Sequence, residues 1–205
     1  AADTLEPGPP RDGEPVGPLP RASVLVLGGD EVYPTASARE YDNRMKGPYR
    51  AALPDAPDAP SMFVLPGNHD WYDGLTSFLR MFAQGRSIGG WRTRQTRSYF
   101  AVQLPHRWWL VGLDTQFGSE LDAPQLRYFT RFLTAELQPG DSVILCSATP
   151  TWVTTADEKH RDAFNSLHWF DRNYIRTRHD DEGQIEQTGA SVRLWITGDS
   201  HHYAR

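Results

Sequence analysis

The chain has little that would support a disulfide, a membrane span or a secretory signal. Its single cysteine, Cys146, lies inside the apolar run SVILC, which excludes an internal disulfide and favours a small buried side chain. No apolar run approaches the roughly 18 residues that a membrane-spanning helix needs, and no charged-then-apolar signal segment opens the sequence. We therefore expect a soluble chain, with the cytoplasm as the favoured compartment.

Basic residues are also in short supply. The 205 residues hold 21 Lys and Arg against 26 Asp and Glu, a formal net charge of -5. Surfaces that bind the phosphate backbone of a nucleic acid normally show a basic excess, so we expect no nucleic-acid partner. Proline, in contrast, is plentiful, with 16 residues in all and six of them within 1–22. This first segment has almost nothing that can pack, so we interpret it as a loop or poorly ordered arm before one domain over 23–205.

The ordered part alternates between strands and helices. Apolar and β-branched runs predict strands over 23–30, 62–66, 97–104, 107–114, 141–146 and 191–197, with the third and fourth forming an antiparallel hairpin. Apolar residues at helical spacing predict helices over 36–52, from about Thr76 onward, over 122–137 and over 159–174. Pro48 should interrupt the first helix, Asp122 should cap the third, and a charge-rich loop should precede the last strand. This order indicates a mixed sheet covered by helices, hence an α/β or α+β fold.

Three short polar clusters follow three of these apolar runs. They are Gly-Gly-Asp at 28–30, Gly-Asn-His-Asp at 67–70 and Gly-Asp-Ser-His-His at 198–202. A glycine after a buried strand lets the backbone turn sharply, so that the next side chains project from the sheet edge. Open α/β sheets bind their ligands at such strand ends, so we expect the clusters to share one crevice. Their carboxylate, amide and imidazole groups suit one or two divalent metal ions.

The first and last clusters each have a metal-binding and a structural interpretation. Asp30 would be an anionic ligand able to bridge two cations, or else a turn-forming or helix-capping aspartate. His201 or His202 would bind a metal through a ring nitrogen, with Asp199 as a nearby oxygen donor, or else belong to a solvated tail.

The central cluster adds a proton donor to the metal ligands. Asn68 would supply a carbonyl oxygen to a metal, while the neighbouring His69 would protonate a leaving oxygen. Asp70 would orient that imidazole by accepting a hydrogen bond from its other nitrogen. The structural alternative is an Asx-turn with a surface histidine.

The segments GGDEVY, LPGNHDWYDGL and ITGDSHHY, in this order, resemble signature blocks of the calcineurin-like metallophosphoesterase superfamily. IGGWRTRQTRSYF and LPHRWWLVGLD are most similar to a bacterial branch whose members are often large, with membrane segments outside the catalytic domain. The resemblance implies a four-layer α/β/β/α sandwich with a dinuclear metal centre at the strand ends. By family role, Asp30 would bridge both metals, Asn68 would bind the second and His201 the first. His69 would act as the general acid or stabilise the transition state.

The chain departs from the family pattern at three places. The opening Asp-x-His motif is missing, and the remnant proposed for it, Ala2–Thr4, would make Asp3 a ligand of the first metal. Ala148 stands where the family has a histidine ligand, and Asp199 replaces the first histidine of the final block. Among Mn²⁺, Mg²⁺, Fe and Zn²⁺, this exchange of imidazole for carboxylate shifts the expected preference toward Mn²⁺ or Mg²⁺.

The sequence therefore predicts a metal-dependent phosphoesterase that hydrolyses a phosphomonoester or phosphodiester with two bound divalent ions. The alternative, which the altered motifs favour, is a catalytically weak or inactive domain that serves as a binding scaffold in a larger, membrane-linked protein. Arg92, Arg94 and Arg97 form a basic stretch that either contacts a phosphate or lies in an exposed loop. No oligomeric state follows from the sequence.

Overall fold

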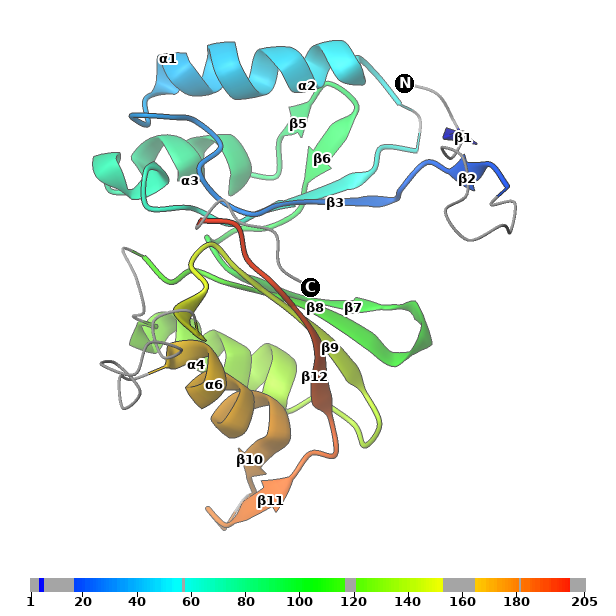
Figure 1. Ribbon diagram of the computed structural model, residues 1–205, viewed down its shortest axis with the longest axis vertical. Coiled ribbons are helices and arrows are strands. Elements are labelled where there is room, and N and C mark those ends of the chain that lie inside the picture. Colours follow the sequence, from blue (N-terminus) through cyan, green and yellow to red (C-terminus); the bar gives the residue numbers. More distant parts are fainter. Residues whose placement is uncertain are drawn as a thin grey trace.

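The structure is a computed structural model, and it describes residues 4–5, 17–56, 58–116, 121–152, 165–180 and 182–199. These residues form a mixed α/β protein with two mainly parallel four-strand sheets. Figure 1 shows the two sheets facing each other, with helices on the outer side of each. Within this described part, no helix is both long and apolar enough to cross a membrane.

Each sheet has one antiparallel edge strand. The first sheet has the order β3-β4-β6-β5 and consists of β3 (Val24–Leu27), β4 (Ser61–Val64), β5 (Ser87–Ile88) and β6 (Trp91–Thr93). The second has the order β12-β9-β8-β7 and consists of β7 (Phe100–Leu104), β8 (Trp108–Leu113), β9 (Ser142–Ser147) and β12 (Ser191–Ile196). β5 and β7 are the antiparallel strands. The pairing of β7 with β8 confirms the predicted hairpin.

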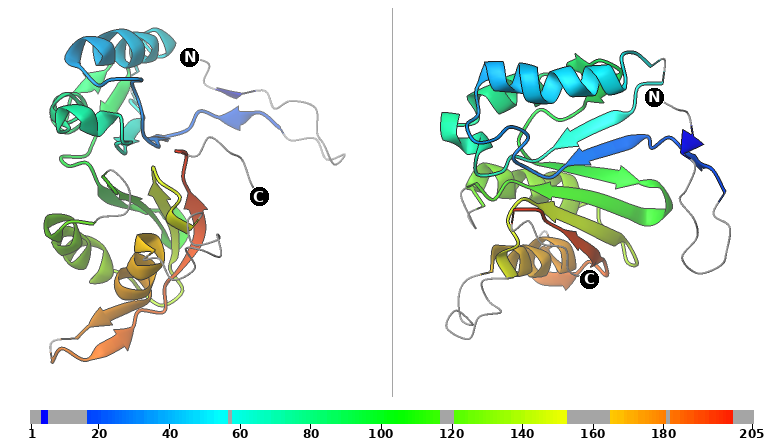
Figure 2. Two further views of the ribbon diagram at one scale, coloured as in Figure 1. Left: turned by 60° about the vertical axis from the view of Figure 1, so that its left-hand side comes forward. Right: turned by 45° about the horizontal axis from the view of Figure 1, so that its top comes forward.

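Four helices cover the outer faces of the sheets in the described ranges. The first sheet carries a helix over 38–52, made of α1 (Ala38–Glu40), a π-helical segment (Tyr41–Lys46) and α2 (Gly47–Ala52), and also α3 (Thr76–Phe82). The second carries α4 (Ala123–Phe129) and α6 (Ser166–Phe170), each continued by a π-helical segment to Thr134 and Arg176 respectively. Both views in Figure 2 keep the two helical layers on opposite sides of the paired sheets.

Two predicted helix starts are confirmed, and one predicted interruption is wrong. α3 begins at Thr76, and Asp122 caps α4 by accepting a hydrogen bond from the Gln125 N–H at 2.8 Å. Pro48 does not interrupt its helix, because the preceding backbone is π-helical and the Gly47 N–H already reaches back to the Asp42 carbonyl. Pro48 then lies in the first turn of α2, where its missing N–H costs little.

Alternating side chains along the strands fill three separate apolar cores in the described part of the chain. In β4, Met62 packs toward the helices of the first sheet, whereas Phe63 packs toward the second sheet. In β9, Val143 faces the helices of the second sheet, whereas Cys146 lies between the sheets and is buried, as predicted. Strands buried on both faces need apolar residues at every position, which explains why they appear as unbroken apolar runs in the sequence.

The first 22 residues contain more structure than predicted. β1 (Thr4–Leu5) and β2 (Leu19–Pro20) form a short antiparallel pair in the segment that we interpreted as a loop or poorly ordered arm. Most of that segment, 1–3 and 6–16, lies outside the described residues.

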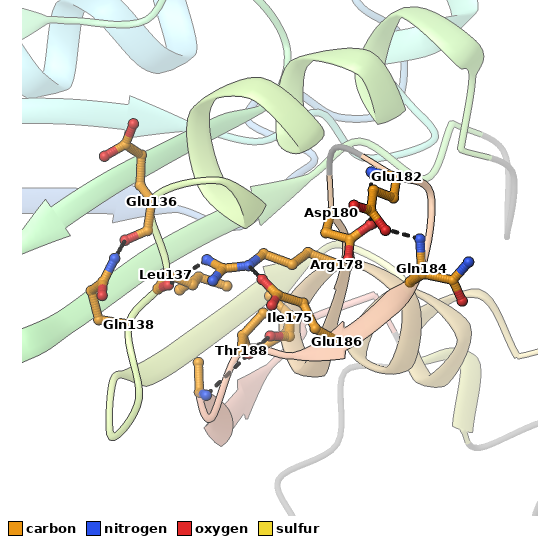
Figure 3. A network of polar contacts seen from close by, with 11 residues as sticks. Glu136, Leu137, Gln138, Ile175, Arg178, Asp180, Glu182, Gln184, Glu186 and Thr188 are labelled. Carbon is orange, nitrogen blue, oxygen red and sulfur yellow. Dashed lines mark hydrogen bonds and ion pairs between the residues drawn. The ribbon is translucent and has the colours of Figure 1, made fainter.

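The predicted charge-rich loop before the last strand is wrong, because it contains a hairpin of β10 (Thr177–His179) and β11 (Ile185–Gln187). Arg178 on β10 pairs with Glu186 directly opposite on β11 and also donates to the Leu137 carbonyl after α4, at 3.4 Å (Figure 3). The Asp180 carboxylate accepts two backbone N–H groups at the tip of the hairpin. Polar cross-strand pairs therefore hold this hairpin, and they leave no apolar periodicity in the sequence.

Candidate functional site

The ends of β3, β4, β9 and β12 surround a pocket of about 380 Å³. It is lined by Gly28, Gly29, Asp30, Gly67, Ala148, Gly198 and Asp199. The structure thus brings together the first, second and third polar clusters, which are far apart in the sequence. β3 and β4 come from one sheet and β9 and β12 from the other, so the pocket lies where the ends of both sheets meet.

Two glycines allow the loops after β3 and β4 to touch. Gly29 has a φ of +123°, in the region that favours glycine, and turns the chain directly after β3. At Gly67, an added Cβ would lie only 2.1 Å from Oδ1 of Asp30. The sequence signal of a glycine after an apolar run therefore corresponds to a real close approach of two backbones.

Asp30 joins the two loops through both its backbone and its side chain. Its Oδ1 accepts the His69 N–H at 3.0 Å, and its own N–H donates to Oδ2 of Asp70 at 2.9 Å. The residue has a positive φ of 54°, which aspartate tolerates better than most residues. Asp30 therefore links the two loops across a long sequence distance and lines the pocket as a candidate metal ligand.

Asn68 carries a buried side-chain oxygen that has no partner in the described part of the chain. Its Oδ1 has no hydrogen bond from any of the described residues, although almost no solvent reaches it. A buried amide oxygen normally accepts a hydrogen bond, so an orphaned one needs an explanation. An amide oxygen is a suitable ligand for a hard divalent cation, and this unsatisfied atom fits the predicted role of Asn68.

His69 is oriented by a main-chain carbonyl. Its Nδ1 lies 2.5 Å from the Pro34 oxygen, and a carbonyl only accepts, so Nδ1 carries a hydrogen and donates it. The ring lies between Tyr33 and Tyr72, with centroid distances of 4.3 and 4.8 Å.

Asp70 has different partners from the predicted one. Its Oδ2 accepts the N–H groups of Asp30 and Gly67, each at 2.9 Å, and its Oδ1 accepts the Tyr41 hydroxyl. The side chain is fully buried, and burial raises its pKa. Asp70 therefore holds the two loops together, and the orientation of the His69 ring that we assigned to it comes from Pro34 instead.

Glu31 is a site residue that the sequence interpretation missed. Its Oε1 accepts the Gly29 N–H at 3.1 Å. Burial raises the pKa of Glu31 well above its usual range, and the charge of nearby Asp70 raises it further. Nothing in the sequence indicated that Glu31 belongs to the site except its position directly after Asp30. An acidic residue in a turn is ordinarily solvated, so its burial could not be expected.

The wall formed by β9 and β12 offers fewer donors. The Ala148 carbonyl accepts the N–H groups of Gly198 and Asp199, at 3.1 and 3.0 Å, and its side chain presents only a methyl group. Asp199 is exposed and lines the pocket. The other predicted ligands, Asp3 and His201, and the alternative His202, lie outside the described residues.

Beside the pocket, Trp71 connects the β4 loop to the second sheet. Its Nε1 donates to Oδ1 of Asp114 at 3.0 Å, and the same oxygen accepts the Gln116 N–H at 2.9 Å. Asp114 is buried at the end of β8, and this burial raises its pKa. Trp71 packs against the core on the helical side of the first sheet, and its hydrogen bond to Asp114 ties the β4 loop to the end of β8.

In the described part of the chain, no group of three or more His, Cys, Asp or Glu side chains is arranged to hold a metal ion. The donors that this part offers are oxygens: the carboxylates of Asp30 and Asp199 and the orphaned amide oxygen of Asn68.

Comparisons with protein-family models, curated proteins and solved structures found no match to this chain.

Proposed function

We propose that this chain hydrolyses a phosphate ester with the help of bound divalent cations, in a four-layer α/β/β/α sandwich of the metallophosphoesterase type. The observation that carries the proposal is the buried Asn68 oxygen, which has no partner among the described residues. Asn68 directly follows Gly67 in the chain, and Gly67 lines the pocket that Asp30 and Asp199 share. The arrangement of helices outside two facing sheets is consistent with such a sandwich.

Several residues near the pocket would bind the divalent cations. Asp30, Asn68 and Asp199 would hold the cations, with Asp3 and His201 added by the family resemblance. Bound divalent cations supply positive charge for the phosphate oxygens and lower the pKa of a coordinated water. Oxygen donors of this kind favour Mn²⁺ or Mg²⁺.

His69 would donate a proton to the leaving group. With Nδ1 donating to Pro34, the protonated ring offers its Nε2 hydrogen to a leaving oxygen. Asp70 would act only as a positioning residue, because its oxygens already accept from two backbone N–H groups and from Tyr41.

Hydrolysis of p-nitrophenyl phosphate and bis(p-nitrophenyl) phosphate with added Mn²⁺ tests the proposal. We expect activity in the wild type and its loss in Asp30→Ala and Asn68→Ala. Asp42→Ala is the matched control, since Asp42 is an exposed carboxylate on the outer helix that pairs with Lys46. Equal background rates in all four proteins would reject the phosphoesterase proposal.

The second candidate is a catalytically weak scaffold with the same fold that binds a ligand or partner. It is favoured by Ala148, which gives the β9 end of the pocket a methyl group in place of a metal ligand. Metal analysis after dialysis against Mn²⁺ separates the two candidates. About two ions per chain would support the enzyme, whereas no bound metal and a Tm that Mn²⁺ does not change would support the scaffold.

A further inference from the structure

A second groove, of about 400 Å³, lies beside β7, the edge strand of the second sheet. It is lined by residues between Arg94 and Gln103, together with Phe63 and Tyr128. None of these residues lines the pocket at the strand ends, so the groove is a separate concavity.

The exposed side chain of Arg97 places its guanidinium group over a tyrosine ring in this groove. Its Cζ lies 5.3 Å from the centre of the Tyr128 ring, within the range of a cation–π contact. Burial raises the pKa of Tyr99, and the positive charge of Arg97 partly offsets this rise, which places the cation near the Tyr99 hydroxyl. The Tyr99 and Tyr128 rings also pack edge to face, with centroids 5.2 Å apart. Arg97 therefore lies against an aromatic wall that Tyr99 and Tyr128 form together.

The arginines of the groove have no acidic partner among the described residues. Arg97 donates to the Thr96 hydroxyl at 3.4 Å, and Arg94 donates to the Ser61 hydroxyl at 3.3 Å. Elsewhere in the chain, arginines such as Arg107 and Arg176 pair with carboxylates, at 3.1 and 2.8 Å. Two arginines that form no ion pair with the described carboxylates make this groove suited to an anion from outside.

We propose that the groove binds a small organic oxyanion, in which a carboxylate or phosphonate-type group is attached to a planar apolar body. Arg97 would be the main anion-binding residue, and Arg94 would add a second positive charge. The planar guanidinium matches two oxygens of such a group in a bidentate contact. The rings of Tyr99 and Tyr128 supply flat apolar surface for the body of the ligand. This site is independent of the proposed hydrolysis.

Isothermal titration calorimetry of the full chain in EDTA, with phenylphosphonate and benzoate as probes, tests this site. Phenylphosphonate has no ester bond to hydrolyse, and the two probes distinguish a phosphonate from a carboxylate. We expect at least one of them to bind with a Kd of about 1 mM or below. Inorganic phosphate and benzyl alcohol, which each keep one half of the ligand, should bind more weakly.

Three variants locate the site. Arg97→Gln and Arg94→Gln should weaken binding, the first by about tenfold or more, because a charge-assisted bidentate contact is lost. Arg97→Lys should also bind less well than the wild type, since it keeps the charge but not the planar fork. Arg92→Gln is the matched control, because Arg92 is an exposed arginine near the groove that does not line it. We expect it to bind like the wild type.

Several outcomes would overturn the proposal. They are no binding of either probe at millimolar concentration, equal losses in Arg92→Gln and Arg97→Gln, and unchanged affinity in Arg97→Gln. Binding that needs a divalent metal and disappears in EDTA would assign the probe to the strand-end pocket instead. Because none of these measurements requires turnover, they stand or fall separately from the phosphoesterase assay.

Discussion

Replacing Gly67 with alanine should destabilise the fold and distort the candidate site, because the new methyl group has no room. The added Cβ would lie 2.1 Å from Oδ1 of Asp30, 2.7 Å from its Cγ and 2.6 Å from its backbone nitrogen. Asp30 cannot simply swing away, because its Oδ1 accepts the His69 N–H and its own N–H donates to Asp70. Relieving the overlap therefore breaks at least one of these hydrogen bonds.

The magnitude follows from these two costs. Overpacking a well-filled site typically costs about 1–3 kcal/mol, and the net loss of one hydrogen bond adds about 1 kcal/mol. We therefore expect Gly67→Ala to lower the free energy of unfolding by about 2–4 kcal/mol. For a chain of this size the corresponding fall in Tm is roughly 4–16 °C.

Urea unfolding followed by tryptophan fluorescence measures this loss, and Gly28→Ala provides the matched control. Gly28 lines the same pocket, but an added Cβ there meets no atom within 4 Å. The control should stay within about 0.5 kcal/mol of the wild type. If the two variants were equally stable, the close approach of the β3 and β4 loops would not exist as described.

Three further predictions concern buried groups. Burial raises the pKa of Cys146 to about 12, so iodoacetamide should label the native protein far more slowly than the urea-unfolded one; equal rates would contradict the buried thiol. Tyr41→Phe removes the hydroxyl that donates to the buried Asp70 and should cost about 1–3 kcal/mol in the same unfolding assay, whereas Tyr33→Phe, at an exposed ring, should cost little. Asp114 has a raised pKa in the folded state, so the folded state binds its proton more tightly and gains stability as the pH falls through that pKa. Asp114→Asn should therefore become more stable relative to the wild type as the pH rises from acid to neutral, and a parallel pair of stability curves would refute this assignment.

The sequence predicted the strands better than it predicted what stabilises the site. β4, β8 and β9 are buried on both faces, and this burial leaves the unbroken apolar runs that identified them. The meeting of Asp30 with Gly67 could also be foreseen, because β3 and β4 are parallel neighbours whose ends lie at one edge of their sheet, whereas Asp199 reaches the pocket from the second sheet.

What the sequence could not predict depends on contacts between distant segments. The partners of Asp70 lie on three separate segments, and nothing near Asp70 in the sequence indicates Tyr41 or the Asp30 N–H. Glu31 is buried beside Asp70, a residue 39 positions away, so its position in a polar turn alone suggested a solvated side chain. The β10–β11 hairpin was missed because its pairs, such as Arg178 with Glu186, are polar.

The two halves of the candidate site differ in how firmly the described residues hold them. On the β3–β4 side, Asp70 binds two backbone N–H groups and Tyr41, and Asp30 binds the His69 N–H, so the loops are fixed by side chains as well as by the sheet. On the β9–β12 side, the contacts around Asp199 are backbone bonds to the single Ala148 carbonyl. A ligand on the β3–β4 side therefore meets groups that are already in place and loses little free energy to ordering them. Asp199, which is exposed, must give up more freedom to take part, so the Asn68 side of the pocket should dominate the affinity for a cation.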